Sequence, residues 1–196
     1  MITLTGEDIS KKQYRDLILY LLKKCEFFTF CLPDFGKLIT VSDGERTAQR
    51  LDDGSAFISY KNKVMPEIEK LSTHLVQVYE SEIYGLNEYD REREIYVVKI
   101  DDSLDASFFD NHSLYDWRYP GFPEDICFYK DGKCFMETVA HEQLSFFYFT
   151  DEELESFLQE KNIEYWIEDD FKYISILLKN GSSFRLEFQE RQSYHL

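Results

Sequence analysis

The stretch from Leu114 to Glu142, LYDWRYPGFPEDICFYKDGKCFMETVAHE, decides how the rest of the chain is interpreted. Its YPGFP segment cannot be helical, because each proline biases the residue before it toward extended conformations. The Asp131-Gly132 pair then lies between two β-rich runs and is a strong signal for a type I′ turn. The stretch therefore predicts a rigid connection followed by a β-hairpin over residues 126–136.

A two-residue turn at this place fixes which residues face one another. We expect Tyr129 opposite Cys134, and Phe128 opposite Phe135. Because both sides of this hairpin are apolar, we expect it near the centre of the fold. One side would carry Cys127, Tyr129, Cys134 and Met136, and the other side would carry Ile126, Phe128 and Phe135.

A second hairpin is predicted over residues 173–188, where YISILLKNGSSFRLEF turns at Asn180-Gly181. Its mixed second face would meet solvent or a partner. The first face would carry Tyr173, Leu177, Phe184, Leu186 and Phe188.

The fold class follows from few helices and many strands joined by hairpins. We predict an α+β fold with a largely antiparallel sheet and about four helices packed on it. The chain of 196 residues is predicted to be a single domain over residues 1–196. Residues 34–62 are an alternative flap or insertion, and residues 85–94 are expected to be an exposed polar loop. The helices are expected to start at Ser10, whose capping box includes Gln13, at Pro66, at Asp102 or Ser103, and at Thr150.

Charge and composition exclude several classes of protein. The net charge is −16, and phosphate contacts need basic patches, so nucleic acid is not an expected partner. The longest apolar runs are too short to span a membrane. The first residues, MITLTGEDISKK, lack a secretory signal pattern, which makes the cytoplasm the expected location.

The acidic residues are unevenly distributed. Residues 150–170 contain nine acidic residues and one lysine, a net charge of −8 that makes up half of the whole excess. This segment is either a solvated face or a docking surface for a basic protein. The residues proposed to bind that partner are Asp151, Glu152, Glu155, Glu168, Asp169 and Asp170.

No cofactor or metal site is predicted. The chain lacks Gly-rich phosphate loops, a GxSxG elbow and an HExxH motif. The four cysteines match no common zinc spacing and are expected to be free, buried thiols. The absence of a catalytic motif favours a non-enzymatic protein without excluding an enzyme.

His141 is the first candidate for catalysis. It follows a predicted strand, and a histidine oriented by a carboxylate is the minimal general-base unit. Glu142 lies beside it in the sequence, and Glu124 and Asp125 follow the proline turn. The alternative is a strand-end histidine that binds a backbone carbonyl.

Trp117 and Arg118 are the candidates for ligand binding. A tryptophan at this place either fills the core or lines a pocket. The sequence alone leaves both alternatives open.

The stretch 114–142 also resembles a family of small, uncharacterised cytosolic bacterial proteins. The matching residues are Leu114 to Trp117, Pro123 to Phe128, Asp131, Gly132 and Ala140 to Glu142. The resemblance covers this stretch well and the first 160 residues loosely. That family brings no established activity, cofactor or catalytic residue to this chain.

Three functions remain as hypotheses. The first is a non-enzymatic protein-binding module with an acidic docking face, of the immunity-protein or antitoxin type. The alternative is an unrecognised enzyme, or a small-ligand-binding protein, with a site around Trp117 and His141. The third is an oligomeric scaffold that dimerises through the outer face of the last hairpin.

Overall fold

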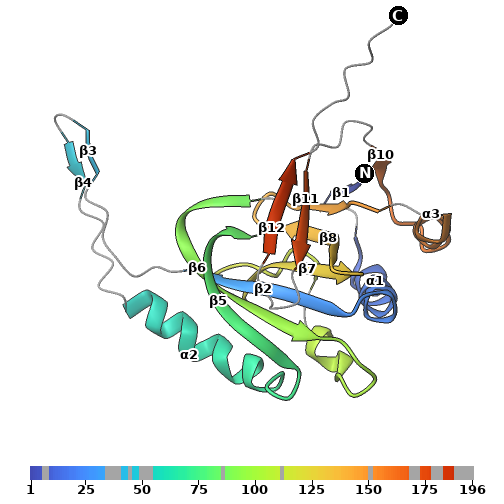
Figure 1. Ribbon diagram of the computed structural model, residues 1–196, viewed down its shortest axis with the longest axis horizontal. Coiled ribbons are helices and arrows are strands. Elements are labelled where there is room, and N and C mark those ends of the chain that lie inside the picture. The colour runs from blue at the N-terminus through green and yellow to red at the C-terminus, as the bar shows by residue number, and fades with distance from the viewer. Residues whose placement is uncertain are drawn as a thin grey trace, which may run out of the picture.

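Eight antiparallel strands form the central layer of the computed structural model (Figure 1). The structure describes residues 1–5, 9–33, 41–43, 46–48, 55–84, 87–110, 113–149, 152–167, 173–177 and 183–187. The strand order is β10-β1-β9-β8-β7-β2-β6-β5. These strands are β1 (Ile2–Thr5), β2 (Phe27–Pro33), β5 (Leu75–Tyr84), β6 (Asn87–Lys99), β7 (Glu124–Lys130), β8 (Lys133–Val139), β9 (Leu144–Phe147) and β10 (Trp166–Ile167).

Two further pairs of strands complete the described sheets. β11 (Tyr173–Leu177) and β12 (Ser183–Glu187) form a hairpin that also contacts β8 through Ile176 and Lys133. β3 (Val41–Asp43) and β4 (Arg46–Ala48) form a separate two-stranded sheet. Every strand pair of the described ranges is antiparallel, which confirms the predicted α+β class.

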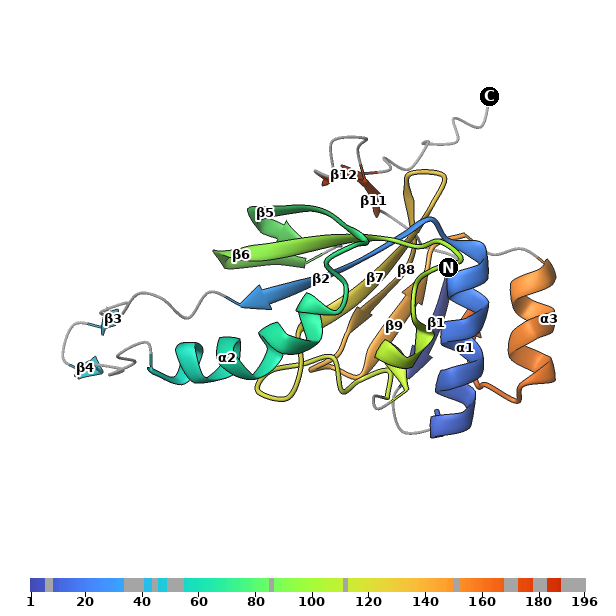
Figure 2. The same cartoon turned by 90° about the horizontal axis from the view of Figure 1, so that it is seen from below.

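The helices all contribute to the core on one face of the sheet. They are α1 (Lys11–Lys24), α2 (Ser55–Glu69), the 3-10 helix η2 (Ala106–Phe109) and α3 (Glu152–Glu160). Buried residues from each join the main hydrophobic cluster, together with Ile126, Phe128 and Phe135 of the central hairpin. Figure 2 shows α2 on one side of the sheet and the β11–β12 hairpin on the other. The described residues thus contain three α-helices rather than about four.

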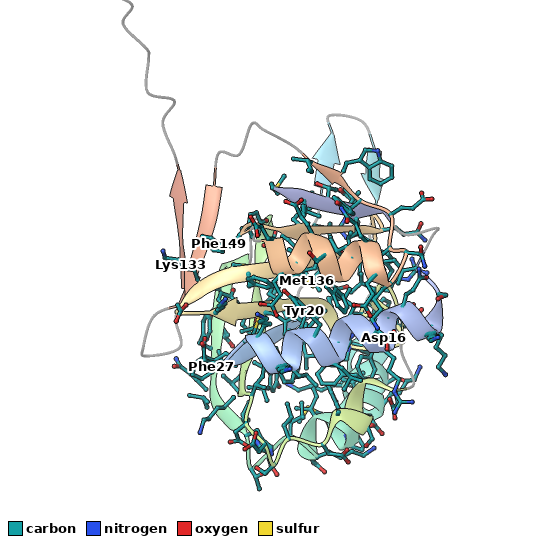
Figure 3. The ribbon with its side chains drawn as sticks, turned by 90° about the vertical axis from the view of Figure 1, so that its right-hand side faces the viewer. Asp16, Tyr20, Phe27, Lys133, Met136 and Phe149 are labelled. Carbon is teal, nitrogen blue, oxygen red and sulfur yellow. The ribbon has the colours of Figure 1, made fainter. Side chains whose placement is uncertain are left out.

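α1 forms where the sequence predicted it. Ser10 is the N-cap, and the reciprocal bonds of the capping box with Gln13 are both present. Figure 3 shows α1 and α3 side by side over the sheet. Tyr20 of α1 stacks on Phe157 of α3 with ring centroids 4.4 Å apart. The apolar side of α1 therefore packs against α3 as well as against the sheet.

α2 contradicts the predicted start at Pro66. The helix begins at Ser55, and Pro66 lies inside its last turn. The apolar stripe of Tyr60, Val64, Ile68 and Leu71 has helical spacing and is buried, and this periodicity was the missed signal. Pro66 removes one backbone hydrogen-bond donor from the helix. The free energy gained by burying this stripe outweighs that loss.

The third predicted helix is also corrected. The cap is Asp105 rather than Asp102 or Ser103, and the segment is a single 3-10 turn. The fourth begins at Glu152 in the described part, and Thr150 lies outside it.

The central hairpin is confirmed with one change of register. Asp131 and Gly132 both have positive φ, 51° and 72°, as a type I′ turn requires. Tyr129 faces Cys134 as expected, but Phe128 faces Met136 instead of Phe135. A β-bulge after the first pairs causes this shift, and it moves Met136 into the same cluster as Phe135.

The polar segment 85–94 is not a loop in its described part. Residues 87–94 form the first half of β6 and pair with β5, for example Arg93 with Ser81. β1 was absent from the predictions, although Ile2 and Leu4 alternate with threonines and are fully buried.

The last hairpin is shifted by one residue from its predicted register. Ile174 faces Leu186 and Ile176 faces Phe184. The predicted two-residue turn would place Tyr173 opposite Phe188. The turn itself, at Asn180-Gly181, lies outside the described residues. The hairpin lies on the side of the sheet opposite α2 (Figure 2). The second, smaller cluster of the core contains Cys31, Ile95, Val97, Cys127, Tyr129, Cys134 and Tyr148.

Candidate functional site

Trp117 is part of the core. Its ring is fully buried, and its Nε1–H donates to the Tyr14 hydroxyl over 3.2 Å. Its nearest aromatic neighbour is Phe122, in an edge-to-face contact at 4.8 Å between centroids. This arrangement satisfies the indole donor and fills the space between η2 and the sheet, as the core alternative expected.

Arg118, next to it, is exposed. It lines a cleft of 360 Å³ formed by Asp116, Arg118, Tyr119, Pro120, Gly121 and Phe122. Trp117 does not line this cleft. The two residues predicted to bind a ligand together therefore point to different environments.

Asp125 is held in an unusual backbone conformation at the start of β7. Its φ of 49° lies in the left-handed region, which few residues other than glycine, asparagine and aspartate adopt. Its N–H donates to the Trp117 carbonyl over 3.0 Å, and its Oδ1 accepts from the Ala140 N–H over 2.8 Å. The register between β2 and β7 shifts here. Asp125 thus joins the proline turn to the end of β8.

Glu124 lies beside Asp125 and forms an ion pair with Arg93 of β6. The two side chains are 21% and 18% exposed, so the pair is largely removed from water. Burial raises the pKa of the Glu124 carboxyl above its ordinary value, although the Arg93 charge lowers it. The Asp125 charge raises this pKa further, and the His141 charge lowers it slightly.

His141 lies on the surface at the same end of the sheet. Its side chain is 65% exposed, and its Nε2 is 3.6 Å from Oε1 of Glu142. His141 directly follows Ala140, whose N–H donates to Asp125, and this places it at the same end of the sheet as Glu124 and Asp125. Glu142, at 57% exposure, contacts His141 on the solvent side.

Arg93 is the functional candidate that sequence reasoning missed. The polarity of residues 85–94 predicts a loop and hides the alternation of Arg93 with Ile95 and Val97. This alternation places Arg93 on the same face as the two buried residues. We call Arg93, Glu124, Asp125 and His141 the strand-end cluster.

A second ion pair lies next to this cluster. The Lys61 ammonium of α2 contacts both carboxylate oxygens of Glu94, at 2.7 and 2.9 Å. The Tyr96 hydroxyl donates to the same carboxylate over 3.0 Å. These contacts attach α2 to the edge region of the sheet, which is a structural role for charged residues.

The cysteines do not form a nucleophilic site. All four are free and buried. Burial raises the pKa of the Cys134 thiol well above its ordinary value, and the same holds for Cys31. A thiol of this kind is a poor nucleophile at neutral pH, and His141 on the surface is in no position to activate it. Among the described residues, no group of three or more His, Cys, Asp and Glu side chains could hold a metal ion.

The acidic segment forms a surface around α3 and β10. Glu152 is exposed, Glu155 is half-buried and Glu164 is exposed. Glu153 and Glu160 also belong to α3, but they pair with Lys24 and Lys161 respectively. Asp151, Glu168, Asp169 and Asp170 lie outside the described residues.

Two apolar side chains interrupt this acidic surface. Trp166 is 50% exposed and Ile167 is 60% exposed. Residues 161–165 connect them to α3, and the Gln159 side chain of α3 donates to the Tyr165 hydroxyl over 3.1 Å. We call the surface around α3 and β10 the acidic face, a name for this end of the molecule and not for one side of the sheet. Its residues are Glu152, Glu155, Glu164, Trp166 and Ile167. Figure 1 shows α3 and β10 at the same end of the sheet.

No protein-family model, curated protein or solved structure matches this chain. Within the described part of the chain, no helix combines the length and the apolar character needed to cross a membrane.

Proposed function

We propose that this chain is a non-enzymatic protein-binding module of the cytoplasm, which docks a basic protein through its acidic face. The exposure of Trp166 and Ile167, on the strand that follows the acidic helix α3, carries this proposal. Binding energy at protein interfaces is concentrated in a few anchors, among which tryptophan is enriched. A half-exposed tryptophan is therefore a candidate anchor for a partner.

The surrounding charge favours a basic partner. Glu152 and Glu155 lie in the first turn of α3, where carboxylates are stabilised by the helix dipole and need no basic neighbour. Carboxylates of this kind attract a positively charged protein over distances of about 10 Å at moderate salt. Such attraction increases the association rate and disfavours acidic competitors. An inhibitor of the immunity-protein or antitoxin type has these requirements.

The test is affinity capture from an extract of the source cells at low and high salt. The bait is the whole chain, compared with the variant Glu152→Gln, Glu155→Gln and Glu164→Gln. A control variant changes the net charge by the same amount and carries Glu69→Gln, Glu80→Gln and Asp102→Asn. Its altered residues in α2 and β5 lie toward the other end of the sheet. We expect a basic protein that salt releases and that only the first variant fails to capture.

A second candidate function rests on the strand-end cluster. A buried carboxyl with a raised pKa, beside an arginine and an exposed histidine, suits general acid–base chemistry. Here the experiment is a pH titration of the Glu124 carboxyl by NMR in the wild type and in Arg93→Gln. Because the Arg93 charge lowers the Glu124 pKa, its removal should raise that pKa further. An unchanged titration would contradict this alternative.

A further inference from the structure

β10 is the outermost strand at one edge of the main sheet. It pairs with β1 through Ile2–Ile167 and Thr3–Trp166. On its other side, no strand of the described ranges pairs with it. An edge strand presents backbone N–H and C=O groups to which a further strand can bind. Among the described strands, this edge of the sheet is therefore available for extension.

Both faces of β10 are uncovered. Successive side chains of a strand point to opposite faces of the sheet, so Trp166 and Ile167 lie on different faces. Both are at least half exposed, whereas Ile2 and Leu4 of the neighbouring β1 are fully buried. The change from core to open surface takes place across one strand spacing of about 4.8 Å. A further strand would cover the apolar residues on both faces at once.

The charges around this edge favour a basic segment over a second copy of this chain as the strand that binds there. Proteins commonly protect edge strands with lysines, which repel other edges. Here the nearest charged residue before the strand is Glu164, and Glu168, Asp169 and Asp170 follow it in the sequence. A second copy of this chain would bring like charges together at its own β10. A basic segment would instead find the opposite charge of Glu164 before the strand, within a part of the sequence that is acidic throughout.

We propose that the partner adds an extended, basic segment to the free edge of β10, with Trp166 as its side-chain anchor. This mode is β-strand addition, in which main-chain hydrogen bonds provide affinity and alternate side chains provide specificity. The inference rests on the proposed function, because it names how the acidic face holds its partner.

Two peptides of about ten residues, the length of a long strand, test this inference. One alternates lysine and valine. The other has the same lysines but carries proline in place of every second valine, which prevents strand pairing at equal charge. We expect the first to bind more tightly, on the order of tenfold, which corresponds to one or two net hydrogen bonds.

Hydrogen exchange and fluorescence report where the peptide binds. Strand addition should slow exchange of the backbone amides of residues 164–167. The other edge strand, β5, which exposes Val76 and Val78, serves as an internal control and should not change. Trp166 should lose its accessibility to a soluble quencher, whereas the buried Trp117 has none to lose. Trp166→Ala should weaken binding on the order of thirtyfold, the effect of a hot-spot residue.

The outcomes separate this inference from the proposed function. Equal binding of the two peptides, weakened in both cases by salt and by the variant Glu152→Gln, Glu155→Gln and Glu164→Gln, would overturn strand addition and support the acidic face. Slowed exchange at β5 instead of β10 would also overturn strand addition. If neither peptide binds in a salt-sensitive way, both proposals are contradicted.

Discussion

Trp117 illustrates how one residue can be tested for a structural role. Its ring lies among Phe30, Phe108, Phe109 and Phe122 and is fully buried. We therefore expect Trp117→Ala to lower the free energy of unfolding by about 3–5 kcal/mol. Trp166→Ala is the matched control and should change it by no more than about 0.5 kcal/mol, because that ring is half exposed. Urea unfolding measures both, and similar small effects would contradict a core role for Trp117.

Asp125 combines a strained backbone with a buried hydrogen bond. In Asp125→Ala, an alanine must adopt the left-handed conformation, which should lower the free energy of unfolding by about 1–2 kcal/mol. The Ala140 N–H also loses its acceptor, which should lower it by about 1–3 kcal/mol more. Asp125→Asn tolerates this conformation and keeps an acceptor oxygen, so it should cost much less. Thermal unfolding of the two variants checks this order. Equal destabilisation would mean that the charge, rather than the geometry, matters.

Glu124 predicts a pH dependence of stability. Because burial raises its pKa in the folded state, its protonated form is favoured by folding. This contribution is fully present below the ordinary glutamate pKa of about 4.3 and is lost as the pH rises through the raised value. Relative to the wild type, Glu124→Gln should therefore gain stability as the pH increases across this window. Parallel stability curves for the two proteins, measured by denaturant unfolding at several pH values, would contradict the raised pKa.

Glu124, Asp125 and His141 lie at one end of the sheet, because Asp125 at the start of β7 accepts a hydrogen bond from the Ala140 N–H, which follows β8. Arg93 alternates with Ile95 and Val97, but the local polarity of residues 85–94 favours a loop and hides this signal. In the structure residues 87–94 pair with β5, the strand directly before them in the sequence.

At the scale of elements, Gln13 joins two helices. Its Oε1 completes the capping box of α1, and its Nε2 donates to the carbonyls of Lys161 and Asn162, at 3.1 and 2.6 Å. Gln13→Glu keeps the capping oxygen but sets a carboxylate against two carbonyls. We expect faster hydrogen exchange at residues 161–163 with little change within α1. Ser10→Ala should do the reverse, at a cost of about 1 kcal/mol to α1.

Elements with a local signal were predictable, and elements that depend on distant contacts were not. The α1 cap and the Asp131-Gly132 turn are encoded within a few residues. The bulge that moves Met136 to the other cluster depends on how β7 packs between β2 and β8. α2 begins in a part of the sequence with weak periodicity. Its buried apolar stripe extends on both sides of Pro66, so the residues after Pro66 resemble the start of a separate helix.

At the scale of the whole molecule, the fold separates its two candidate sites. The acidic face lies on the β10 edge of the sheet, whereas Arg93 and Glu124 of the strand-end cluster belong to β6 and β7, several strands away. The α+β class and the antiparallel sheet followed from hairpin signals in the sequence. The exposure of Trp166 did not, because IEYWI reads as an ordinary apolar strand until its position at the sheet edge is known.

The most direct test of the acidic face is the rate of association with the protein captured at low salt. It should be measured at increasing ionic strength for the wild type, for the variant Glu152→Gln, Glu155→Gln and Glu164→Gln, and for the control variant at Glu69, Glu80 and Asp102. We predict a rate constant that falls steeply with salt for the wild type and the control, and a slower, flatter dependence for the first variant. Identical curves for all three proteins, or no captured protein at all, would contradict docking through the acidic face.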